Sequence, residues 1–216
     1  MRTPEWWTLS TAQLAVEALA ILAFALSGVI EGARKRLDVV GVSVVAGLAA
    51  FGGGTLRDVL LDRRPLFWIE HPGWLWGVLA LGIAAMLLMR ARHLAPTERA
   101  MQWPDAIGLA LFNASGLQIA LAAGLPALPA VLMGVVTATF GGVLRDIVCN
   151  EIPHAFSDHR PYAVCAFAGG WLGVAAAGAG MGEGGVLLLT AVSTLALRAL
   201  AVVFDWRLPG WRDPGH

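Results

Sequence analysis

The chain has 216 residues, of which 57% are hydrophobic and only 14% are charged, and its formal net charge is zero. Soluble domains carry about a quarter charged residues, so this composition excludes an ordinary soluble domain. The balanced charge also gives no electrostatic sign of a nucleic-acid partner. We therefore expect an all-α membrane protein that forms a single membrane domain over residues 1–216.

Seven apolar stretches follow one another along the chain, each of about the 20 residues that a helix needs to cross a bilayer. They cover residues 12–33, 39–62, 72–90, 105–123, 127–149, 161–179 and 185–204. The connections between them are short, which leaves no room for a separate soluble domain. The N-terminal segment lacks the basic start and the short apolar run of a cleavable signal, so we interpret it as the first span.

Basic residues are divided unevenly between the two sets of predicted loops. One side of the membrane would hold nine Arg and Lys residues, and the other side would hold three, namely Arg2, Arg63 and Arg64. Because positive charge favours the cytoplasmic side, this pattern predicts an outside N-terminus and a cytoplasmic C-terminus. Tryptophans near the predicted span ends, as in interfacial belts, support the boundaries.

The chain contains an internal duplication with a constant offset of 88 residues. Eleven of the 43 positions in 23–65 recur at that offset. Repeat one covers about 12–90, repeat two about 105–179, and the seventh helix, about 185–204, lies outside both. Three spans in each repeat make the second copy inverted, an arrangement typical of transport proteins with a site near the midplane. The identities include Phe24/Phe112, Ser27/Ser115, Gly53/Gly141, Gly54/Gly142, Arg57/Arg145 and Asp58/Asp146.

Consecutive glycines occur near the middle of the second and fifth spans. Each glycine disfavours a helix by about 1 kcal/mol relative to alanine. Paired glycines in both repeats predict a kink or a short unwound stretch that lines a pathway, because freed backbone is tolerated only against protein or a water-filled cavity. The alternative is close helix packing through small residues. The glycines are Gly52, Gly53, Gly54, Gly141 and Gly142.

An Arg-Asp pair follows the glycines in each repeat, Arg57-Asp58 and Arg145-Asp146. A charge at the bilayer centre costs ~2.5–3.5 kcal/mol on insertion scales, so such groups pair, face a cavity or reach the interface. Neighbouring side chains on a helix point about 100° apart. We therefore expect pairing across the repeats, or with Ser, Thr or Asn on the first span of a repeat, instead of pairing within Arg57-Asp58. The alternative is that Arg57 snorkels outward and that the pairs are only anchors.

Other polar side chains are candidates to line the same pathway, where hydroxyl groups would be ligands of a partly dehydrated ion. Threonine hydroxyls in membrane helices often bond their own backbone, so their role stays open. Glu17, Glu31 and Asp105 lie nearer the span ends, where we expect the interface to hydrate them. The candidates are Ser27, Thr55, Asn113, Ser115, Thr137 and Thr139.

No metal, nucleotide or catalytic motif stands out in the sequence. His154, Asp158 and His159 lie in a polar loop and are a weak sign of a metal site, while Cys149 and Cys165 lack metal-ligand spacing. There is no His-Glu-x-x-His element, phosphate-binding glycine loop or Gly-x-Ser-x-Gly element. We expect neither an enzyme nor a bound cofactor.

Three elements resemble the trimeric intracellular cation (TRIC) channel family, namely Phe24-Ala-Leu-Ser-Gly28, Phe51-Gly-Gly-Gly-Thr-Leu-Arg-Asp58 and Phe140-Gly-Gly-Val-Leu-Arg-Asp146. The match is to the prokaryotic branch, also called the glycine transporter domain family, over about residues 12–205. The resemblance implies a homotrimer of seven-helix protomers, with one pore per protomer between kinked second and fifth helices. It also implies permeation of monovalent cations, mainly potassium, with sodium and membrane lipids as further partners.

One departure limits what the resemblance implies. Animal members carry a Lys-Glu-Val element that is absent here, and the only lysine is Lys35 in a loop, so lysine-based lipid binding and gating are not carried over. The resemblance implies a prokaryotic plasma membrane.

Two alternative functions stay open. One is a secondary transporter of a small zwitterion such as glycine, held by paired Arg and Asp, and the other is an accessory membrane subunit.

Overall fold

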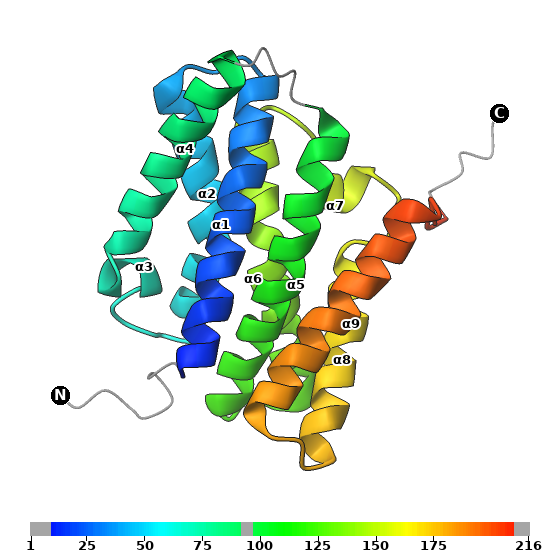
Figure 1. The fold of residues 1–216 in the computed structure, drawn as a ribbon. Helices are drawn as coiled ribbons and strands as arrows, with labels where there is room; N and C mark the ends of the chain where they lie inside the picture. The colour runs from blue at the N-terminus through cyan, green and yellow to red at the C-terminus, as the bar shows by residue number, and fades with distance from the viewer. Residues whose placement is uncertain (1–9, 92–96, 210–216) are drawn as a thin grey trace.

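The computed structural model describes residues 10–91 and 97–209, and nine helices lie within these ranges (Figure 1). The seven predicted spans each correspond to a long helix, and α3 and α7 are single turns in the loops. The all-α fold class is therefore confirmed. The helices are α1 Thr11–Arg34, α2 Val39–Leu60, α3 Phe67–Glu70, α4 Gly73–Ala91, α5 Glu98–Ala122, α6 Ala127–Val148, α7 His154–Ser157, α8 Ala163–Gly178 and α9 Glu183–Val203.

Five of these helices, α1, α2, α5, α6 and α9, are long and apolar enough to cross a membrane. The apolar parts of α4 and α8 are shorter, covering residues 73–88 and 163–178. The bounds also follow the duplication, because α1 and α5 end 88 residues apart, and α2 and α6 both begin and end 88 residues apart. The duplication therefore extends from the sequence to the helix ends.

Local sequence explains several of these ends. Ser10 and Gln13 form a reciprocal capping box at the start of α1, and Asp38 accepts a hydrogen bond from a backbone N–H in the first turn of α2. The turn after α1 needs a positive φ at Arg36 (56°), and the equivalent turn after α5 places Gly124 there (79°). The two repeats therefore keep the same turn geometry, with glycine in only one of them.

The two repeats face each other in opposite orientations. In Figure 1, α1 runs from the bottom of the view to the top, whereas its repeat equivalent α5 runs from top to bottom. The helices α1, α2, α5 and α6 pack together in the centre. The third helix of each repeat packs on its own pair, α4 on α1 and α2, and α8 on α5 and α6. This confirms the inverted repeat.

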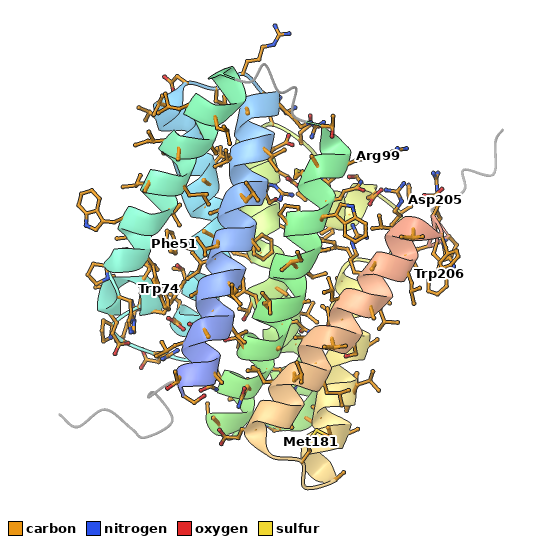
Figure 2. The ribbon with its side chains drawn as sticks, in the orientation of Figure 1. Phe51, Trp74, Arg99, Met181, Asp205 and Trp206 are labelled. Carbon is orange, nitrogen blue, oxygen red and sulfur yellow. The ribbon has the colours of Figure 1, made fainter. Side chains whose placement is uncertain are left out.

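The seventh long helix, α9, lies at the edge of the bundle and packs on α5 and α8. It extends from the turn that contains Met181 to the turn that contains Asp205 and Trp206 (Figure 2). Two glycines of α8 create the contact, because a Cβ at Gly169 or Gly173 would lie 2.1 Å from the hydroxyl oxygen of a threonine on α9. Repeat one has Leu81 and Ala85 at the equivalent positions. Only repeat two is therefore shaped to receive this helix.

The paired glycines do not interrupt their helices, since α2 and α6 are α-helical throughout. The expectation of an unwound stretch is wrong, because the glycines instead allow direct backbone contact. A Cβ at Gly53 would lie 1.9 Å from the carbonyl oxygen of Thr137, and a Cβ at Gly141 would lie 2.2 Å from that of Ala49. The two contacts are equivalent at the 88-residue offset. Packing of the two backbones offsets the helix penalty of glycine.

Candidate functional site

Two clusters of buried charged and hydroxyl side chains lie inside the bundle, and their members are related by the 88-residue offset. All eight side chains are buried, with at most 5% of any residue exposed. Because an isolated buried charge is costly, such groups must satisfy one another. The first cluster comprises Glu17, Arg57, Asp58 and Ser115, and the second comprises Asp105, Arg145, Asp146 and Ser27.

In the first cluster, the guanidinium group of Arg57 bridges two carboxylates. Its Nη1 contacts Glu17 Oε1 on α1, and its Nε donates a hydrogen bond of 2.9 Å to Asp58 Oδ1. Ser115, which comes from α5 of the other repeat, donates to Glu17 Oε1 at 2.7 Å. The cluster therefore joins three helices, two from repeat one and one from repeat two.

Further groups surround the first cluster at the end of α2. The backbone N–H of Phe67 donates to Asp58 Oδ2 at 2.9 Å, and the guanidinium carbon of Arg57 lies 5.4 Å from the centroid of the Phe67 ring. Arg63 Nη1 lies 3.8 Å from Asp58 Oδ1 and is also buried. A second permanent cation therefore accompanies this cluster.

The second cluster repeats the arrangement with the halves exchanged. Arg145 Nη1 lies 2.5 Å from Asp105 Oδ1 on α5, and Arg145 Nε donates to Asp146 Oδ1 at 2.8 Å. Ser27, which comes from α1 of repeat one, accepts from Arg145 and lies 3.4 Å from Asp105 Oδ1. Both the backbone N–H and the ring Nδ1 of His154 contact Asp146 Oδ2, at 2.9 and 3.0 Å.

One sequence prediction holds for Arg145 alone, and two others are wrong. Arg145 donates to Ser27 of the other repeat, as expected. By contrast, Arg57 is linked to Ser115 only through Glu17. However, each arginine also pairs with the aspartate that follows it, because the long arginine side chain folds back although the two Cα–Cβ bonds diverge. Arg57 is fully buried, so it does not snorkel to the interface. The arginines therefore hold the bundle together from inside.

The acidic residues expected at hydrated span ends are in fact buried. Glu17 is 0% exposed and Asp105 is 5% exposed, and each is the main partner of an arginine. Glu31 is 1% exposed and pairs with Arg34 one turn later. The sequence signal for this pairing was the offset, since Glu17 and Asp105 are 88 residues apart, although Glu17 lies outside the region 23–65 that holds the repeat identities.

The other candidate polar residues have structural roles in this conformation. The hydroxyl groups of Thr55, Thr137 and Thr139 each donate to the carbonyl four residues earlier in their own helix, at 2.7 to 2.9 Å. Asn113 donates to the carbonyl of Ala166 and to the hydroxyl of Thr194, so it fastens α8 and α9 to α5. None of these four belongs to either charged cluster.

The polar loop after α6 is organised by ion pairs. His154 bonds to Asp146, and Asp158 lies 3.5 Å from both Arg160 and Arg198. Among the described residues, no group of three metal-ligating side chains forms a site. Cys149 and Cys165 are buried free thiols.

One further ion pair joins the two repeats at the loops. Lys35, after α1, pairs with Glu151, after α6. Hydrogen bonding between these exposed groups raises the pKa of Lys35 and lowers that of Glu151. This contact lies at the end of the bundle that the basic loops predict to be cytoplasmic.

An apolar groove of about 440 Å³ lies beside the glycines, between α2, α4 and α6. Its lining includes Phe51, Gly52, Leu75 and Leu144 and holds none of the charged residues described above. The groove is therefore separate from the two clusters.

Comparisons with known proteins agree with this geometry. The family model described as "Glycine transporter" matches residues 14–90 and again 102–178, two matches that are themselves 88 residues apart. A UPF0126 membrane protein of Vibrio cholerae is 35% identical over 198 residues, which cover 90% of this chain and 80% of the relative. The UPF0126 inner membrane protein YadS of Escherichia coli K12 is 38% identical over 60% of this chain and 62% of its own.

Solved structures extend the likeness to the fold. The TRIC trimeric intracellular cation channel orthologue from Rhodobacter sphaeroides superposes with a TM-score of 0.84 and 30% identity, covering 91% of this chain and all of that one. A prokaryotic TRIC channel in 0.5 M KCl gives a TM-score of 0.83 with 25% identity, covering 91% and 98% of the two chains. These are channels and not enzymes, in keeping with the sequence. The chain therefore belongs to the glycine transporter (UPF0126) family of multi-pass membrane proteins, and it has the fold of the prokaryotic TRIC cation channels.

Proposed function

We propose that this protein is a potassium-permeable channel for monovalent cations. It acts as a homotrimer with one pore in each protomer, between α2 and α6. The observation that carries the proposal is the pair of equivalent charged clusters, one on each side of the glycine crossing of α2 and α6. The likeness to solved TRIC channels supports both the pore and the trimer, since the Rhodobacter protein is named as trimeric.

The charges in the clusters favour a cation over an anion. The second cluster holds two carboxylates for one guanidinium group, so its oxygens exceed what that arginine can neutralise. In the first cluster, Arg63 lies 3.8 Å from Asp58, beside the two carboxylates that Arg57 bridges. Glu17 Oε2 is buried and has no hydrogen-bond partner within the part of the chain that the structure describes. Rings of acidic side chains are one basis of cation selectivity in channels. A permeating potassium or sodium ion would be stabilised at these oxygens.

The glycines supply the adaptable part of the proposed pathway. At Gly53 and Gly141 the backbones of α2 and α6 meet directly, whereas the side chain of Leu144 packs on Gly52 and the ring of Phe67 packs on Gly54. Glycines are frequent positions of helix kinks, so either helix can bend at this crossing. Gly142 lies beside the crossing on α6. The Arg-Asp pairs of the two clusters follow within about two turns on the same helices.

We place the protein in a prokaryotic plasma membrane, with its N-terminus outside and its C-terminus in the cytoplasm. The excess of basic residues in one set of loops supports this orientation. The Escherichia coli relative is named an inner membrane protein. Labelling a cysteine introduced at exposed Ser157 in intact cells tests the orientation, because this loop should react only after the membrane is opened.

The decisive experiment is ion conductance of the purified trimer in planar bilayers and potassium-loaded liposomes. We expect cation-selective current, and we expect Arg57→Gln and Arg145→Gln to alter it in protein that still elutes as a folded oligomer. Arg207→Gln, at a side chain that is 64% exposed, is the matched control. Folded protein that conducts no ion at any voltage would overturn the proposal.

A secondary transporter of glycine is the second candidate. The family description "Glycine transporter" favours it, and a guanidinium beside two carboxylates matches the two charges of a zwitterion. Counterflow of labelled glycine into proteoliposomes separates the two functions. Saturable counterflow without potassium current would establish the transporter, and potassium current without counterflow would exclude it.

A further inference from the structure

Two phenylalanines meet at the centre of the bundle. Phe24 on α1 and Phe112 on α5 are 88 residues apart, and their rings stack with centroids 5.6 Å apart and planes inclined by 20°. Phe24 is 0% exposed and Phe112 is 1% exposed. Because the two positions are equivalent in an inverted repeat, a direct contact between them lies on the pseudo-two-fold axis that relates the halves.

The aromatic pair separates the two charged clusters. On α1, Phe24 lies between Glu17 of the first cluster and Ser27 of the second, positions that are about 15 Å apart along a helix. On α5, Phe112 lies between Asp105 of the second cluster and Ser115 of the first. Each of these two helices thus passes from one cluster to the other by way of the aromatic layer.

The layer around the rings is apolar and tightly packed. The core cluster that contains both phenylalanines consists mostly of alanine and other hydrocarbon side chains, including Leu109 and Ala138. A Cβ at Gly108 would lie 2.5 Å from the ring of Phe24, so the ring rests directly on the backbone of α5. Among the side chains of this core cluster only Tyr162 carries an oxygen, and narrow apolar segments of this kind exclude water and ions.

We propose that Phe24 and Phe112 form the closed gate of each protomer, an aromatic barrier between the two buried charged clusters. The two rings come from α1 and α5 and share a core cluster with Ala49 of α2 and Ala138 of α6, beside the glycine crossing. The inference rests on the proposed channel function. Opening requires α1 and α5 to separate or rotate until water reaches across the rings. The serine contacts oppose this movement, because Ser115 bonds Glu17 and Ser27 lies within hydrogen-bond distance of Asp105, one contact on each side of the gate.

The test measures potassium efflux from liposomes that contain equal amounts of folded oligomer. Phe24→Ala and Phe112→Ala shorten the barrier, and Phe24→Tyr keeps the ring but adds a hydroxyl group that binds water. We expect each change to raise efflux severalfold over the unaltered protein. Phe167→Ala is the matched control, because Phe167 is a half-exposed ring of α8 that packs on Trp171, and we expect no change there.

The outcomes separate the gate from the channel. If the unaltered protein conducts and all three folded variants leak no faster, the gate is overturned and the channel stands. If the tyrosine variant alone folds, its efflux decides the question. If the unaltered protein is silent and the variants conduct, the gate is supported. Folded protein that is silent in every form would overturn the channel function itself.

Discussion

The first and second clusters share four equivalent positions, but the groups around them differ. In the first, buried Arg63 lies near Asp58 and the ring of Phe67 covers Arg57. In the second, the imidazole of His154 bonds to Asp146. The residue equivalent to Arg63 is Glu151, which is exposed. Duplication therefore preserved the central ion pairs while the neighbouring cation changed, from a permanent guanidinium to a titratable ring.

The largest expected effect comes from removing either central arginine. Arg57→Gln and Arg145→Gln each remove the guanidinium group that bridges two buried carboxylates, which should lower stability by about 3–5 kcal/mol. Unfolding in a denaturing detergent measures the loss. Adding Glu17→Gln to Arg57→Gln should recover part of it, because it removes one of the stranded charges. A variant as stable as the unaltered protein would show that its cluster is energetically minor.

Replacing the crossing glycines should have the next largest effect. Gly53→Ala and Gly141→Ala place a methyl group about 2 Å from a carbonyl oxygen, so α2 and α6 must separate, at a cost of about 1–3 kcal/mol each. Gly47→Ala is the control on α2, since nothing lies within 4 Å of its Cβ position. It should be neutral or stabilising, by up to about 1 kcal/mol, because alanine favours a helix. Equal effects at Gly47 and Gly53 would contradict the close crossing.

The cross-repeat serines should contribute less and unequally. Ser115→Ala removes a hydrogen bond of 2.7 Å to Glu17. By contrast, Ser27→Ala removes the hydroxyl that accepts from Arg145 and also lies 3.4 Å from Asp105. Polar contacts between membrane helices contribute about 0.6 kcal/mol on average. We expect both changes to exceed this value and the Ser27 change to be the larger, because Ser27 contacts two charged groups. Ser193→Ala, where the hydroxyl bonds its own helix, is the control. Thermal unfolding of the oligomer measures the ranking, and the reverse order would contradict it.

The smallest effect should come from the exposed loop pair. The pKa of Glu151 is lowered, so its stabilising contribution is present above the ordinary carboxyl range and is lost as the pH falls through the lowered value. The pKa of Lys35 is raised, so its contribution is lost only at strongly alkaline pH. Lys35→Gln should therefore have a small effect that is constant around neutral pH and disappears in high salt. An effect that varies between about pH 6 and 8 would mean that other groups are involved.

Sequence reasoning predicted the helices and the inverted repeat because both depend on local quantities. Apolar length determines a span, and an odd number of spans inverts the second copy. The partners of the arginines depend instead on which faces of distant helices meet. Glu17 and Asp105 lie near the ends of apolar stretches, which predicts an interfacial position, but the packing of α1 on α5 buries them. The glycines were ambiguous for the same reason. The helix propensity of glycine does not indicate whether the backbone of another helix, here at Thr137 or Ala49, packs against it.

The reciprocal serines also bear on the origin of the molecule. Ser115 of repeat two completes the cluster of repeat one, and Ser27 of repeat one completes the cluster of repeat two. Both serine contacts could form between two identical three-helix chains, provided that the two copies had opposite orientations in the bilayer. The geometry is therefore that of a dual-topology dimer whose two subunits were fused into one polypeptide. Once fused, each half was free to change independently, as Arg63 and His154 show.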